Sequence, residues 1–156
     1  MDRTAPIGVR MRADARINSR QRAASFATPV GPDENGNEVF ELVSKGWNRY
    51  REKGNTYRIW TKFLDERDEV LAIHLELVGV SERGVFDKHR SNKHNDRIVL
   101  PQNVGLQVAD IDCVADNDGN TDRLRKEVEE IVKEGMKKGL KDLIAKGIVK
   151  AGTTVF

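Results

Sequence analysis

A chain of 156 residues, of which 33% are charged and 38% hydrophobic, is long enough for one domain with a buried core. The charged fraction is high for a globular protein, so much of the surface is expected to be solvated or to lie against partners. The single cysteine, Cys113, excludes an intrachain disulfide, and the lack of an apolar run of about 18 residues excludes a membrane-spanning helix. The first residues contain no apolar signal-peptide core, so we expect a virion or cytoplasmic protein rather than a secreted one.

The first 32 residues differ from the rest of the chain in charge. They contain six arginines and two aspartates for a net charge of +4, whereas the remaining 124 residues carry −2. Few apolar side chains accompany these charges, so the segment is expected to gain order only on a partner. An extended basic arm and linker is therefore predicted over residues 1–37, with a single domain over 38–156. The arginines of the arm are Arg3, Arg10, Arg12, Arg16, Arg20 and Arg22.

The segment after the linker favours a short helix. Val39, Val43, Trp47 and Tyr50 recur at nearly helical spacing, which predicts a helix over about residues 38–52. The run VFELV is also compatible with a strand, and an internal glycine weakens the helix.

The middle of the chain predicts strands. Residues 56–64 alternate in polarity and residues 70–80 are mostly apolar, which indicates an antiparallel hairpin whose second arm is a central strand. Residues 81–97 are predicted to be a polar loop, and one or two further strands are expected on either side of Pro101, which should mark a bend or an edge.

The last segment predicts a long amphipathic helix over residues 121–150. Apolar residues recur there at i, i+3 and i+4, with acidic residues near its start and lysines near its end. The predicted fold is therefore α+β. It comprises an antiparallel sheet of three to five strands over about residues 56–114, packed by the long C-terminal helix, with a shorter helix before it and an extended N-terminal arm.

The acidic run at residues 110–122 is the most site-like patch. Alternate carboxylates around a glycine are typical of a Ca²⁺ loop. With Gly119 as the sixth position, however, the first and twelfth positions fall on Val114 and Arg125, which cannot supply the required ligands. We favour a strand-to-helix turn whose acids cap the helix, with a loose cation site as the alternative.

The three histidines give no metal or catalytic pattern. His89 and His94 are spaced five residues apart, which fits neither one face of a helix nor a tight chelate, so a solvated loop is expected. His74 alternates with apolar neighbours and is expected to be a half-exposed sheet residue. We predict no catalytic residues, no cofactor and no metal. An enzyme would require Asp112, Asp116 and Asp118 to converge with a histidine around a metal ion.

The first function hypothesis is a non-enzymatic structural subunit of a large assembly. The six arginines would dock the arm on other protein subunits, and the arm would order on assembly. By analogy of architecture alone, we expect a phage virion protein in a capsid, connector or tail position, oligomeric in situ and with no membrane partner.

The second hypothesis is a nucleic-acid-binding protein. The arm would lie on phosphates, and a patch in which aromatic and basic residues interleave would stack on bases. The residues of this patch are Trp47, Arg49, Tyr50, Arg51, Tyr57, Arg58 and Trp60.

Overall fold

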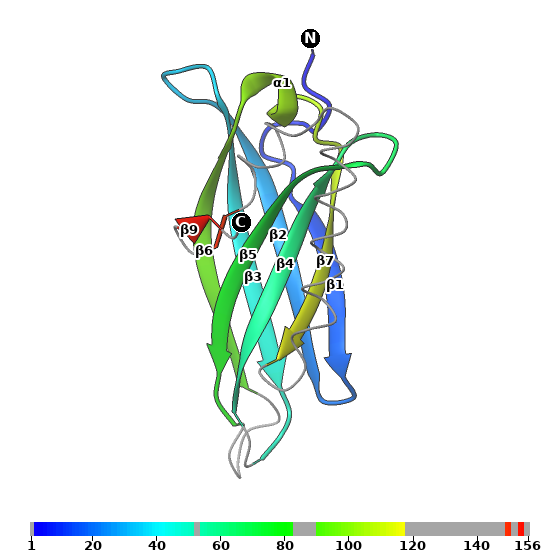
Figure 1. Ribbon diagram of the computed structural model, residues 1–156, viewed down its shortest axis with the longest axis vertical. Helices are drawn as coiled ribbons and strands as arrows, with labels where there is room; N and C mark the ends of the chain where they lie inside the picture. The colour runs from blue at the N-terminus through cyan, green and yellow to red at the C-terminus, as the bar shows by residue number, and fades with distance from the viewer. Residues whose placement is uncertain (1, 52–53, 83–89, 118–148, 151–152, 155–156) are drawn as a thin grey trace.

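The computed structural model describes residues 2–51, 54–82, 90–117, 149–150 and 153–154, which form two β-sheets stacked face to face (Figure 1). In spatial order, sheet A contains β1 (Met11–Asn18), β2 (Gln21–Pro32), β3 (Glu38–Asn48) and β6 (Arg90–Leu100). Sheet B contains β7 (Asp110–Asn117), β4 (Asn55–Leu64), β5 (Val70–Val80), β8 (Val149–Lys150) and β9 (Thr153–Thr154). Neighbouring strands are antiparallel, except that β5 and β8 are parallel.

The predicted α+β fold with three to five strands is wrong. The described residues form a β-sandwich with four strands in one sheet and five in the other, and their only helix is α1 (Gln102–Gly105). The predicted long helix over 121–150 lies outside the described residues, apart from Val149 and Lys150, which form β8. Within the described ranges, no helix has the length and hydrophobicity to cross a membrane.

The prediction of an extended N-terminal arm is also wrong, because residues 11–32 form β1 and β2. A strand needs apolar residues only at every second position, and here the inward positions carry small side chains such as Ala13, Ala15 and Ala23. β2 pairs with β3 from Gln21 to Pro32, so the predicted boundary at residue 37 falls between adjacent strands of one sheet.

The predicted helix over 38–52 is replaced by β3. Its inward positions include Phe40, Leu42 and Ser44, which are all buried, whereas the outward residues between them are more exposed. Gly46 is also inward, and a Cβ atom there would lie 2.8 Å from Cε2 of Tyr57. The glycine that weakened the helix prediction therefore allows the two sheets to approach closely.

The hairpin predicted in the middle of the chain is confirmed. β4 and β5 pair antiparallel, and the Asp65 carboxylate accepts hydrogen bonds from the backbone N–H groups of Arg67 and Glu69 in the turn between them. The strands on either side of Pro101 are β6 and β7, and Pro101 ends the first of them at the start of α1. The polar loop predicted over 81–97 is wrong for residues 90–97, because these belong to β6.

The interior contains two apolar clusters. One surrounds Phe40 and Phe63, whose rings contact edge to face, and the other surrounds Tyr57 and Ile59. Between them lies a layer of buried polar side chains that spans both sheets and includes Ser25, Ser44, Thr61 and His74. The interior therefore has a polar middle layer with an apolar cluster on either side.

Substitution of Gly46 by alanine tests this packing. The new methyl group would overlap the buried Tyr57 ring, and we expect a loss of about 1–3 kcal/mol in the free energy of unfolding, measured by urea denaturation. Gly79→Ala is the matched control, because a Cβ there meets nothing within 4 Å, and its loss should not exceed about 0.5 kcal/mol. Equal stabilities of the two variants would contradict the close approach of the sheets at Gly46.

Candidate functional site

The outer face of sheet A gathers most of the N-terminal arginines. Arg16 on β1, Arg22 on β2 and Trp47 on β3 lie side by side in the register of the sheet. They point away from sheet B, because the residues that alternate with them pack inward. We call this surface the basic face and define it by Arg10, Arg12, Arg16, Arg20, Arg22, Phe26, Lys45, Trp47, Tyr50, Lys93 and Arg97.

Cations lie over the aromatic rings of the basic face. The Cζ atom of Arg22 is 4.3 Å from the ring centroid of Trp47, and the Nζ atom of Lys45 is 4.8 Å from it. The other pairs are Arg10 and Arg12 over Phe26, at 4.7 and 5.2 Å, and Arg20 over Tyr50, at 5.4 Å. These are cation–π distances, so the rings and the charges form one surface rather than separate patches.

The basic face has few carboxylates of its own. By register, Asp14 and Glu41 lie among its cations, and Asp14 pairs with Arg12 at 3.0 Å. The other four N-terminal arginines of the face have no carboxylate within ion-pair distance in the part of the chain that the structure describes. The face therefore presents an excess of positive charge to solvent.

Arg3, the first arginine of the predicted arm, lies away from the basic face. Its guanidinium group donates to both carboxylate oxygens of Glu38, at 2.9 and 3.1 Å, and the Glu38 side chain is buried. Arg3 therefore ties the N-terminus to the start of β3 and is committed to the fold.

The predicted aromatic patch is divided between the two sheets. Trp47 and Tyr50 belong to the basic face, whereas Tyr57 and Trp60 are buried in sheet B and are not available for base stacking. The Tyr57 hydroxyl donates to the Trp47 backbone oxygen at 2.8 Å, and burial raises the pKa of Tyr57 well above its usual range. Of the patch's arginines, Arg49 and Arg51 are exposed just after β3, and Arg58 lies on sheet B.

Sequence reasoning missed four members of the basic face: Phe26, Lys45, Lys93 and Arg97. The signal that could have found the first two is the two-residue period along β2 and β3, which places them on the same face as Arg22 and Trp47. Lys93 and Arg97 required the pairing of β3 with β6, which no local pattern indicates.

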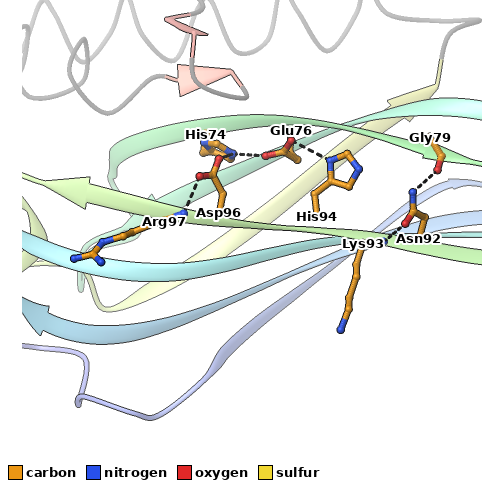
Figure 2. Close-up of polar contacts among 8 residues, drawn as sticks. All are labelled: His74, Glu76, Gly79, Asn92, Lys93, His94, Asp96 and Arg97. Carbon is orange, nitrogen blue, oxygen red and sulfur yellow. Dashed lines mark hydrogen bonds and ion pairs between the residues drawn. The ribbon is translucent and has the colours of Figure 1, made fainter.

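A second group of polar side chains lies where the inner faces of β5 and β6 meet. Figure 2 shows Glu76 between His74 and His94, with Asp96 beside His74. The Nε2 atom of His74 is 3.0 Å from Oε2 of Glu76 and 3.5 Å from Oδ2 of Asp96. His74 was expected to be half-exposed, but it is fully buried, because it pairs with the inward Thr61.

The acidic run does not form a Ca²⁺ loop within the described residues. Asp110, Asp112 and Asp116 lie on β7, on the face that points away from sheet A, and Asp112 pairs with Lys62 at 3.5 Å. The rest of the run, from residue 118 onward, lies outside the described residues, as does His89. Successive carboxylates along a strand project side by side rather than toward one centre.

Cys113 is a buried thiol in the polar layer. It lies on the inner face of β7, where the Ser25 hydroxyl donates to its sulfur at 3.4 Å while contacting the Thr61 hydroxyl at 2.6 Å. Burial raises the pKa of Cys113 to about 11.

Comparison with known proteins gives no relatives. No protein-family model matches the chain, no curated protein is significantly similar to it, and no solved structure matches its fold significantly. The function therefore has to be inferred from the residues themselves.

The raised pKa of Cys113 predicts a loss of stability at high pH. The unfolded thiol loses its proton near pH 9 and the folded thiol near pH 11, so this contribution is full below pH 9 and is lost as pH rises to about 11. Between these limits we expect wild-type protein to lose about 2–3 kcal/mol more unfolding free energy than Cys113→Ala, measured by urea denaturation. Parallel pH profiles for the two proteins would show that the thiol is not buried in this way.

Proposed function

We propose that this protein binds single-stranded nucleic acid on the basic face. The observation that carries the proposal is the stacking of Arg22 and Lys45 on Trp47, and of two arginines on Phe26, over one solvent-facing sheet surface. Cations beside aromatic rings suit a strand whose phosphates need neutralising and whose bases need a stacking platform.

Single strands fit this surface better than duplexes. The rings are carried on a four-stranded sheet face, and an aromatic ring can stack only on a base that is not already stacked in a helix. Phe26 and Trp47 are on adjacent strands, and by register they are four positions apart, about 13 Å along the sheet. They therefore offer separate platforms for different bases of one strand.

The structural-subunit hypothesis, including a phage virion location, stays a prediction that no finding tests. It was based on an arm that needs a foreign surface to become ordered. Residues 11–32 instead find their partners within the sandwich, so this reason for expecting an assembly no longer applies. For the same reason we favour the nucleic-acid function over it.

Arg22→Gln tests the charge of the face. Binding of a fluorescein-labelled oligothymidylate would be followed by anisotropy from about 50 mM to about 200 mM salt. Affinity falls as salt rises, and we expect the slope of log affinity against log salt to become shallower by about 0.7, because one phosphate contact is lost. Arg67→Gln, an exposed arginine in the β4–β5 turn, removes the same charge elsewhere and should leave the slope unchanged.

Trp47→Leu tests the stacking platform separately from the charge. We expect affinity to fall by about 1–3 kcal/mol at every salt concentration, with the salt slope preserved. Failure of wild-type protein to bind at low salt would contradict the proposal. So would binding by Arg22→Gln and Trp47→Leu that is as tight as binding by wild type and by the control Arg67→Gln.

A further inference from the structure

The meeting line of β5 and β6 brings metal-ligating side chains together, independently of the basic face. We propose that His74, Glu76 and Asp96, with His94 beside them, bind a divalent transition-metal ion, for which Zn²⁺ is the test ion. This departs from the sequence-based prediction that the chain has no metal site.

The geometry is close to that of a zinc site. One donor atom from each of His74, Glu76 and Asp96 lies within 4.8 Å of the others. Bonds of about 2.0–2.2 Å in a tetrahedral zinc site place the donor atoms about 3.3–3.6 Å apart, so only small side-chain movements are required. The Nδ1 atom of His94 is 3.3 Å from the second carboxylate oxygen of Glu76, which puts a fourth donor within reach.

The charge of the cluster also calls for a cation. The His74 side chain is fully buried and that of Glu76 is 6% exposed. Among the described residues, neither Glu76 nor Asp96 has a lysine or arginine within ion-pair distance. Two carboxylates without a lysine or arginine partner thus lie in a partly dehydrated space, and one divalent ion would balance the charge of both.

The donor set indicates which metal ions fit. Imidazole nitrogens with carboxylate oxygens suit Zn²⁺ and similar first-row ions, whereas Ca²⁺ requires six or more oxygen ligands and Mg²⁺ an octahedron of oxygens. The Nδ1 atom of His74 is buried without a hydrogen-bond partner in the described part of the chain. Since none of the described groups holds the ring through this nitrogen, we expect binding about 10- to 100-fold weaker than at a site with such a partner.

The position of the cluster lets an ion enter from solvent and lets a bound ion join the two sheets. The Asp96 and His94 side chains are 35% and 43% exposed, so an ion can enter from solvent. His74 and Glu76 belong to sheet B, whereas Asp96 and His94 belong to sheet A. A bound ion would therefore join the two sheets and stabilise the folded state.

The test is calorimetric titration of the full chain with Zn²⁺ near pH 7.5, together with thermal unfolding with and without the ion. We expect one equivalent of Zn²⁺ to bind wild-type protein and to raise the unfolding temperature. Asp96→Asn and His94→Gln remove exposed donors with little risk to folding, and each should weaken binding at least about tenfold. Ca²⁺ should bind far more weakly than Zn²⁺.

Asp110→Asn is the matched control. In both Asp96 and Asp110 one carboxylate oxygen accepts the next residue's backbone N–H at 2.8 Å, but Asp110 lies on β7, away from the cluster. The Asp110→Asn variant should bind Zn²⁺ with the same affinity as wild-type protein. Absence of Zn²⁺ binding by wild-type protein, binding unchanged in both Asp96→Asn and His94→Gln, or Ca²⁺ binding as tight as Zn²⁺ would each overturn the proposal.

Discussion

Small side chains on the inner face of sheet A determine how the two sheets meet. Ala23 packs in the cluster around Tyr57 and Ile59, with Ala13 and Ala15 at its border, and Gly46 leaves room for the Tyr57 ring itself. Alanines facing large side chains fill the interior without pushing the sheets apart. Because inward and outward residues alternate, the same packing turns the intervening arginines of β1 and β2 to solvent. The basic face is therefore the reverse side of this core.

The fold was predictable where strand patterns were strong and local. The β4–β5 hairpin was predicted correctly, because the residues of β4 alternate in polarity and those of β5 are mostly apolar. The N-terminal strands were missed because their inward residues are mostly alanines, with Ser25 among them. In the sequence, such small side chains look like a segment that has no apolar surface to bury. β3 was missed because Val39, Val43 and Trp47 satisfy helical spacing as well as alternation. The register of the sheet, which depends on contacts distant in sequence, decides between these patterns.

The candidate sites were predictable only in part, for the same reason. The arginines and Trp47 were identified by residue type, but it is the register of β1, β2 and β3 that places them on the same face of the sheet. The grouping of His74 and Glu76 with Asp96 could not be found, because Asp96 lies twenty residues beyond Glu76 on a strand of the other sheet. The first six residues of β6 are exposed, which is why this strand resembled a loop. This first part of β6 faces a polar cluster and has no apolar side that alternation could reveal.

β6 connects the two proposals through its alternation. Lys93 and Arg97 face outward with the basic face, whereas His94 and Asp96 face inward, toward β5. One strand thus contributes to a charged outer surface and to a polar inner cluster without any residue serving both. Among the described strands, β6 has one hydrogen-bonded neighbour, β3, and contacts between its inner side chains and β5 provide a second attachment. The side chains that would hold a metal ion therefore also fix the edge of the proposed nucleic-acid surface, and the two sites would be coupled through the position of β6 rather than through shared contacts.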